Sequence, residues 1–340
     1  MILVTGGTGL VGSHLLYYLS LSENSVRATY RNKSKINMVK HVFSYYSSNY
    51  AVLFAKIEWV EASLNDMPKL FQAFQDITVV YHCAAAVTFD PNRYHELRKV
   101  NIEGTANIVN LCIANNVQKL CYASSIAAIG DDISGYPATE KTPWNPEADN
   151  NIYGITKHGG EMEVWRGTQE GVNAIIVNPG IIVGPGFWKA SSGSLIRRIY
   201  KGINYHTSGV SGYIDIHDVV KSMIQLMQST IKNERFILVA DHLSIKEFTE
   251  KVATNLHVKA PQKEAPKLLL QIAWRLDWLS YFFKRKYRRL TRHNVQSLLS
   301  KSYYNNEKIC ATIGIEFKSI DTSIKETCYL FLKDSSASQA

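Results

Sequence analysis

The feature that most constrains the fold is a glycine-spaced turn at the start of the chain. An apolar run, Ile2–Thr5, leads into Gly6, Gly9 and Gly12, and a helical pattern covers Val11–Ser20. The first glycine permits a tight turn, the second lets backbone N–H groups approach a pyrophosphate, and the third allows close helix–strand packing. This order predicts a dinucleotide-binding turn, with a purely structural turn as the alternative. The expected contact residues are Thr5, Gly6, Gly9, Leu10, Val11 and Gly12.

Up to about residue 185, short β-branched runs alternate with amphipathic stretches of helical spacing. This alternation is typical of a parallel sheet covered by helices on both faces, and several of the runs are apolar throughout, as doubly covered strands should be. The predicted strands are 2–5, 26–31, 57–62, 79–84, 119–124, 174–178 and 235–239, and the clearest helices are 11–20, 66–74, 94–115 and 153–170. We therefore predict an α/β fold with a Rossmann-type doubly wound parallel sheet.

After residue 185 the alternation stops and short helical patterns dominate. They cover 194–201, 217–228, 245–254, 266–284, 305–313 and 322–332. This change predicts a smaller, mainly helical C-terminal substrate lobe over the carboxyl edge of the sheet. The expected division is a nucleotide-binding core at 1–185 to which 210–242 return, a substrate lobe at 186–209 and 243–333, and a flexible tail at 334–340.

The end of the second predicted strand bears on the choice of dinucleotide. An NAD-specific enzyme usually presents a carboxylate there to the ribose 2′-hydroxyl. Residues 28–35 read ATYRNKSK and contain no acid; Arg31 can bind a 2′-phosphate bidentately, with Lys33 or Lys35 adding charge. A solvated basic loop is the alternative interpretation. The sequence therefore favours NADP(H), with NAD as the second choice.

Tyr153 and Lys157 stand four residues apart in a predicted helix, so their side chains share one face. Tyrosine has an ordinary pKa of about 10 and needs an adjacent cation to act as an acid–base group near neutrality. Lys157 can supply that charge and reach a bound ribose. This spacing is weak evidence alone, but the predicted strand 119–124 ends in Ser124 and Ser125, at the edge where α/β sheets bind ligands. The combination predicts hydride-transfer chemistry.

Seven segments, in order, resemble the extended short-chain dehydrogenase/reductase family of the NAD-dependent epimerase/dehydratase type. The resemblance covers most of the chain and is closest to the dihydroflavonol-reductase-like and 3β-hydroxysteroid-dehydrogenase-like branch. The segments are 5–12 (TGGTGLVG), 82–86 (HCAAA), 101–105 (NIEGT), 122–125 (YASS), 153–157 (YGITK), 178–186 (NPGIIVGPG) and 213–220 (YIDIHDVV).

The resemblance implies roles for individual residues. Tyr153 becomes the proton donor or acceptor with Lys157 as its partner, and Ser125 the polarising hydroxyl with Ser124 as the fallback. Asn101 in this family more often secures the sheet, so it stays outside the catalytic set. The implied cofactor contacts in this part of the chain are Ala84, Ala85, Ala86, Ser124, Tyr153, Lys157, Pro179 and Ile182.

One position departs from the family pattern. The third predicted strand ends in Glu61-Ala62-Ser63-Leu64, where the family usually has an aspartate that binds the adenine amino group. Ser63 can accept only a neutral hydrogen bond, roughly half as strong as a charge-assisted one. Ser63 and Leu64 are still expected at the adenine, with weaker recognition than at the phosphates.

Two pairs of residues are candidates for the substrate end of the site. Thr88 and Phe89 follow the fourth predicted strand, and Phe187 and Trp188 follow the glycine-rich segment 184–186. Packing at the interface of the two lobes is an equally weighted alternative for both pairs.

The stretch 268–283 is rich in leucine and aromatic residues and precedes the basic run KRKYRR at 284–289. It contains Arg275 and Asp277 and falls short of the roughly 20 apolar residues that a membrane span requires. We expect a lid helix over an apolar substrate cleft, with peripheral membrane contact or a partner helix as minor alternatives.

Composition excludes several function classes. The net charge of +9 concentrates late in the chain, so it does not imply nucleic acid. The five cysteines form no C-x-x-C pair, and no second histidine stands at metal spacing from His82; we expect free thiols and no metal. No export signal is recognised, so a cytoplasmic protein is expected, and a homodimer is left open.

The leading functional hypothesis is an NADP(H)-dependent oxidoreductase. It would reduce a ketone or aldehyde, or oxidise the corresponding secondary alcohol. The expected partner is a small-molecule substrate with an apolar part that fits an apolar cleft. An NAD-dependent sugar-nucleotide epimerase or dehydratase uses the same tyrosine and lysine and is the runner-up; Lys189, Arg197 and Arg198 could bind its diphosphate. A non-catalytic redox sensor is the third alternative, although such relatives typically lose the tyrosine or the lysine.

Overall fold

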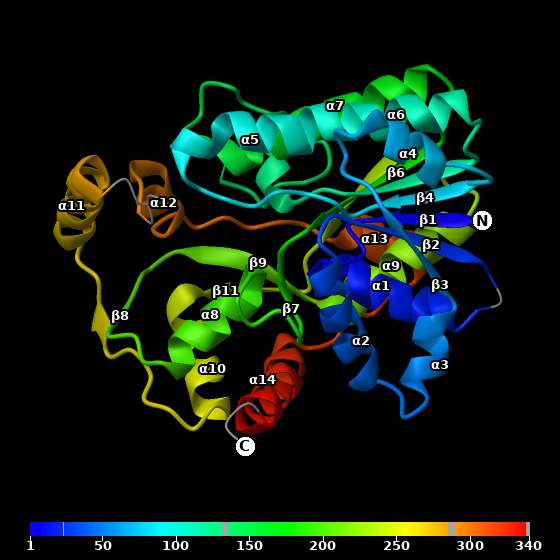
Figure 1. The fold of residues 1–340 in the computed structure, drawn as a ribbon. Helices are drawn as coiled ribbons and strands as arrows, with labels where there is room; N and C mark the ends of the chain where they lie inside the picture. The colour runs from blue at the N-terminus through cyan, green and yellow to red at the C-terminus, as the bar shows by residue number, and fades with distance from the viewer. Residues whose placement is uncertain (23, 131–134, 285–289, 338–340) are drawn as a thin grey trace.

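The central element is a seven-stranded parallel sheet, which confirms the predicted fold class. The computed structural model describes residues 1–22, 24–130, 135–284 and 290–337. The sheet has the order β10-β6-β5-β4-β1-β2-β3 (Figure 1). Its strands are β1 (Ile2–Thr5), β2 (Val26–Tyr30), β3 (Ile57–Glu61), β4 (Val79–His82), β5 (Lys119–Ala123), β6 (Ala174–Pro179) and β10 (Glu234–Leu238). The strand order reverses at β1, and such a switch point is where α/β sheets bind ligands.

Helices cover both faces of this sheet because both faces are apolar. On one face, buried side chains from α1 (Leu10–Ser20), α2 (Ile36–Ser44) and α9 (Ile216–Gln228) form one hydrophobic cluster with the strands. On the other face, α4 (Met67–Ala73) and α6 (Gly104–Ala114) pack with α7, whose bounds are Ile152–Gln169. Figure 1 shows these two helical layers above and below the strands.

Two local features of the core differ from the sequence prediction. The basic segment after β2 continues through the 3₁₀ turn Lys33–Lys35 into α2, and a further helix, α3 (Tyr50–Ala55), precedes β3. The predicted helix 94–115 is divided into α5 (Tyr94–Arg98), the π-helical turn Lys99–Glu103 and α6. These elements were missed because short helices have little periodicity and a π turn has no sequence signature.

Beyond β6 the chain forms small sheets in addition to the expected helices, and one of them includes residues 181–183 and 210–215 of the predicted core. Strands β11 (Asp241–Ser244), β9 (Val210–Asp215) and β7 (Ile181–Val183) form a three-stranded sheet, and β8 (Tyr205–His206) pairs with β12 (Lys263–Glu264). The helices α8, α10, α11, α12, α13 and α14 span Ser191–Tyr200, Ile245–Asn255, Lys267–Lys284, Arg292–Ser297, Glu307–Ile313 and Ile320–Ala337. A separate hydrophobic cluster joins β7, β9, α8, α10 and α14.

The tail predicted to begin at residue 334 is wrong for residues 334 to 337, which continue α14. The carboxylate of Asp334 accepts a hydrogen bond from the hydroxyl of Tyr45 and another from Trp188 Nε1 at 2.7 Å. His41 Nε2 lies 3.0 Å from the same carboxylate. The end of the chain therefore ties the second lobe to α2. Residues 338–340 lie outside the described part.

Helix α11 lies at the side of the molecule next to α12 (Figure 1). An apolar stripe along it is exposed, made of Leu268, Leu269, Ile272, Leu276 and Leu279. Among the described residues, no helix is both long and apolar enough to cross a membrane. Residues 285–289 of the basic run lie outside the described residues.

Candidate active site

The candidate catalytic residues meet at the carboxyl edge of the sheet. Ser125 follows β5, and Tyr153 and Lys157 lie in the first turns of α7. The helix begins where Asn151 accepts a hydrogen bond from the N–H of Gly154 at 2.8 Å, a typical N-cap. The cap fixes the first turn of α7, and with it the position of the phenol relative to the end of β5.

Tyr153 is held between a hydroxyl and an aromatic ring. Its phenol contacts the side chain of Ser125 through a hydrogen bond, and Phe89 packs edge-on against its ring with centroids 5.8 Å apart. Burial raises the pKa of Tyr153 to about 12, and the hydrogen bond from Ser125 opposes that rise. The phenol is therefore protonated at neutral pH and can act as a proton donor.

Lys157 is buried, with only 1% of its surface exposed. Its Nζ donates to the hydroxyl oxygen of Tyr122 at 2.7 Å and to the carbonyl of Ala123 at 2.8 Å. Burial lowers its pKa to about 7, whereas the negative charge of Glu161 acts to raise it. The ammonium is thus anchored to the last two residues of β5, which immediately precede the two serines.

The two serines after β5 point in different directions. Ser124 is buried, and its Oγ donates to the carboxylate of Glu161 at 2.5 Å. Ser125 is partly exposed, and its Oγ accepts from the N–H of Ala127 at 3.2 Å. The hydroxyl beside the tyrosine is therefore that of Ser125, and the fallback Ser124 is committed to the interior.

The alanine segment after β4 is fixed by an asparagine. Asn101 Oδ1 accepts from the N–H of Ala86 at 2.8 Å, while Nδ2 donates to the Ala86 carbonyl and to the Thr156 hydroxyl. This side chain is buried in the π-helical turn and links the segment 84–86 to α7. Its contacts agree with a securing role.

His82 and Thr5 face the interior. His82 Nδ1 lies 2.6 Å from the Thr5 hydroxyl and its Nε2 lies 3.1 Å from the hydroxyl of Thr105. Burial lowers the pKa of His82 to about 3, so the ring is neutral. The Thr5 side chain is therefore used within the core, and only its backbone is left for the cofactor turn.

The glycine turn fits a dinucleotide phosphate. Gly6 has φ of +70°, and a Cβ added there would lie 2.5 Å from the backbone nitrogen of Ala84; one added at Gly12 would lie 2.3 Å from the Gly6 carbonyl oxygen. Helix α1 begins at Gly9 without a side-chain cap and without an acid in its first turn. Its first N–H groups and positive dipole end can therefore receive an anion.

Arg31 is exposed immediately after β2, beside the turn Lys33–Lys35. Glu96 on α5 is bonded to Arg93, and the charges of Arg93 and then Arg31 contribute to lowering the pKa of Glu96. An acid from a distant helix thus lies near the predicted phosphate-binding cation. The sequence around residue 31 gave no signal of it.

Three of the four remaining predicted cofactor contacts lie at or just beyond strand ends. Ser63 and Leu64 follow β3, with Ser63 partly exposed and Leu64 buried. Pro179 ends β6 and is buried, and Ile182 lies in β7, partly buried. Ser63, Leu64 and Pro179 lie at or just beyond the ends of strands of the central sheet, where a ligand of such sheets binds, whereas Ile182 belongs to the three-stranded sheet.

The candidate substrate residues separate into two groups. Phe89 is 44% exposed and lies against Tyr153, and the neighbouring Thr88 bonds the N–H of Asp90. Trp188 instead packs edge-on against Phe331 of α14 and donates to Asp334, while Phe187 packs with the core. These contacts support the lobe-packing interpretation for Phe187 and Trp188.

A family model now identifies the class of protein. The model of the NAD dependent epimerase/dehydratase family matches residues 2–239, well over half of the chain, so the chain belongs to that family. The resemblance stated from the sequence is thereby confirmed. Its members act on alcohol and carbonyl groups, so the chain is an NAD(P)-dependent enzyme of this kind.

Individual relatives span reductases and epimerases. A putative dihydroflavonol 4-reductase of Synechocystis sp. is 26% identical over 96% of this chain and 93% of that protein. The UDP-glucose 4-epimerase of Vibrio cholerae is 28% identical over 78% of each chain. The crystal structure of a UDP-glucose 4-epimerase from Thermotoga maritima, with UDP-glucose, has the same fold, with a TM-score of 0.77 at 20% identity over 98% of this chain and 99% of that one.

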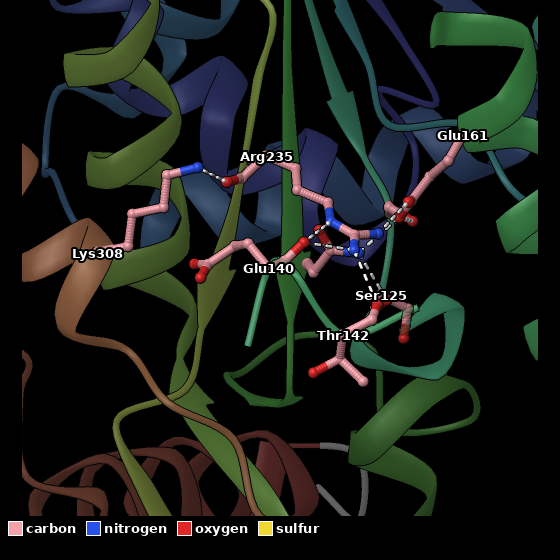
Figure 2. Close-up of polar contacts among 8 residues, drawn as sticks. Ser125, Glu140, Thr142, Glu161, Arg235 and Lys308 are labelled. Atoms are coloured by element: carbon pink, nitrogen blue, oxygen red, sulfur yellow. Dashed lines mark hydrogen bonds and ion pairs between the residues drawn. The ribbon is translucent and has the colours of Figure 1, made fainter. Parts of the chain in front are cut away.

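Sequence reasoning missed the polar residues beneath the site. Glu161 on α7 is fully buried and bonded to Ser124 and to Asn178. It is also bonded to Arg235 of β10 (Figure 2). The available signal was the spacing Tyr153, Lys157, Glu161, which places all three on one helix face. A carboxylate at that spacing is ordinarily an exposed helix residue, so the pattern alone did not distinguish it.

The buried ammonium predicts a pH dependence of stability. Because the pKa of Lys157 is about 7 when folded and about 10.5 in an exposed lysine, the unfolded chain binds more protons between these values. The contribution of Lys157 to stability therefore rises with pH in that window. The free energy of unfolding of the native protein minus that of Lys157→Met should increase from pH 7 to pH 9, approaching about 1.4 kcal/mol per pH unit for one proton.

Urea unfolding at several pH values measures this difference. Subtracting the variant cancels the groups that titrate independently of Lys157. A difference that stays level from pH 7 to pH 9, or that falls, would mean that Lys157 keeps an ordinary pKa.

Proposed function

We propose that this protein is an NADP(H)-dependent oxidoreductase that reduces a ketone or aldehyde, or oxidises the corresponding secondary alcohol. The observation that carries the proposal is the placement of the Tyr153 phenol between Ser125 and Phe89, one helical turn from the buried amine of Lys157. The partly exposed Phe89 supports an apolar portion in the substrate.

The residues divide the chemistry between them. The nicotinamide, when bound, supplies or accepts the hydride. Ser125 holds the substrate oxygen by hydrogen bonding, and Tyr153 gives that oxygen its proton in the reductive direction and takes it back in the oxidative one. Lys157, one helical turn further along α7, would favour the phenolate that remains after proton donation when it carries a positive charge.

Arg31 supports NADP(H) as the cofactor. Its guanidinium is exposed at the end of β2, where the 2′-position of the adenosine ribose is expected, and a guanidinium matches a phosphate bidentately. Glu96 nearby is engaged by Arg93 at 2.7 and 2.5 Å. The net local charge is therefore positive, which suits a 2′-phosphate better than a 2′-hydroxyl.

A sugar-nucleotide epimerase or dehydratase is the second candidate. The similarity to the Vibrio cholerae epimerase, 28% identity over 78% of the chain, favours it. Arg197 and Arg198 lie on α8 and could serve a diphosphate. The absence of an acid among residues 28–35 argues against the tightly held NAD that such chemistry recycles.

The assignment of the proton donor predicts the effect of one hydroxyl. Tyr153→Phe removes the acid but keeps the ring against Phe89, so turnover should fall by about 10²–10⁴-fold or more. The dissociation constant for NADPH should change little. The matched control is Tyr136→Phe, at a phenol that is 75% exposed. Retained turnover in Tyr153→Phe, with any carbonyl substrate that the native protein reduces, would refute the assignment.

The cofactor assignment predicts a charge-reversal effect. Arg31→Glu should weaken NADPH binding by ~10–100-fold, because a charge-assisted pair to the 2′-phosphate is replaced by repulsion. NADH, which lacks that phosphate, should be affected much less. Arg98→Glu makes the same change in net charge at an exposed side chain of α5. Fluorescence titration with both nucleotides decides the matter, and an equal loss for the two would remove Arg31 from the phosphate site.

A further inference from the structure

A buried polar cluster lies directly behind the candidate catalytic residues, and neither the family match nor the expected chemistry assigns it a role. Its centre is Glu161, whose side chain is 0% exposed, and its cationic member is Arg235, whose side chain is 16% exposed. The two come from α7 and β10. A buried charge without compensation is very costly, so a fold that retains one in this place needs a specific set of partners.

The carboxylate of Glu161 has three partners. It accepts from Ser124 Oγ at 2.5 Å, from Asn178 Nδ2 at 2.5 Å and from Arg235 Nη1 at 3.3 Å. Asn178 Nδ2 also lies 2.9 Å from the carbonyl oxygen of Ser125. The carboxylate therefore holds one serine directly and the next through Asn178, which sets where the Ser125 hydroxyl stands.

Arg235 extends the cluster to the segment 140–142. Its guanidinium donates to the carbonyls of Glu140 and Thr142, and Figure 2 shows these groups converging on it from several elements. The carboxylate of Glu140 accepts in turn from the N–H of Ile237 on β10. The pair thus joins α7, β5, β6, β10 and residues 140–142.

Glu161 also stands one helical turn after Lys157, on the same face of α7. Burial raises the pKa of the Glu161 carboxyl, whereas the hydrogen bond from Ser124 and the charge of Arg235 act to lower it. The ionised carboxylate opposes the effect of burial on the ammonium of Lys157. The other groups around the ammonium are the Tyr122 hydroxyl and the Ala123 carbonyl, with His82 neutral on β4. Among these groups around Lys157, Glu161 is the one that carries a carboxylate.

We infer that Glu161 is a positioning residue for the Ser125–Tyr153–Lys157 site. It fixes the serine pair at the end of β5 and places a carboxylate one helical turn from Lys157, while Arg235 holds the carboxylate in place. This inference deepens the proposed function and rests on it for its catalytic part. Glu161 itself contacts neither substrate nor cofactor in this role; it acts through Ser125 and Lys157.

The test separates this role from a merely structural one. Glu161→Gln keeps the size of the side chain and an acceptor oxygen but removes the charge. In the Glu161→Gln background, the free energy of unfolding is compared with and without Lys157→Met, and the pH dependence of this difference gives the pKa of Lys157. That pKa should fall by about one pH unit relative to the native protein. In the same variant kcat should fall by about 10–100-fold while KM for NADPH changes little, because the glycine turn is elsewhere.

Two further variants keep the test decisive. Glu161→Gln combined with Arg235→Met removes both charges, so it should unfold at a higher temperature than Arg235→Met, which strands the carboxylate, while the low Lys157 titration persists. Glu163→Gln, on the same helix in a surface pair with Arg166, should leave both the titration and kcat unchanged.

A loss of stability in Glu161→Gln without a shift of the Lys157 titration and without a fall in kcat would overturn the inference. If the native protein turns over no carbonyl substrate, the proposed function fails on that result alone. The unfolding measurements need no substrate, and they would then decide by themselves whether Glu161 sustains the charge of Lys157.

Discussion

The burial of one ammonium group constrains the rest of the site. Lys157 is almost completely removed from water, and an unpaired charge there would destabilise the fold severely. Its compensation comes from the Tyr122 hydroxyl and the Ala123 carbonyl on β5, and from the carboxylate of Glu161 one turn along α7. The strand that anchors the cation is also the strand that presents Ser125, so charge compensation and catalytic geometry are parts of the same arrangement.

The core was largely predictable from the sequence. The strands of the central sheet end within two residues of the predicted positions, because most of these doubly covered strands are short apolar or β-branched runs, and the first of them leads directly into a glycine turn. Tyr153 and Lys157 were recognisable because their spacing is local, within one helix. The pair Ser124 and Ser125 was recognisable because it ends a strand at the ligand-binding edge, and the family resemblance singled out Ser125.

The parts that were missed depend on contacts between residues distant in sequence. Glu161 and Arg235 are 74 residues apart, and Glu96 approaches Arg31 from another helix. No periodicity reports such pairs. After β6, the strands β7 and β11 are short and pair with β9 rather than with the central sheet, and the last helix continues through Asp334, whose partners Tyr45 and Trp188 come from elsewhere in the chain. Tertiary contacts, rather than local propensity, determine these elements.

The most direct test of the account is the nucleotide state of the purified protein, measured by native mass spectrometry before and after dialysis. A reductase of the proposed kind binds NADPH in preference to NADH and exchanges it freely, so dialysis should leave the protein without nucleotide and added NADPH should rebind. An epimerase or dehydratase recycles its cofactor within one active site. NAD that stays bound through dialysis, and that NADPH does not displace, would contradict the account.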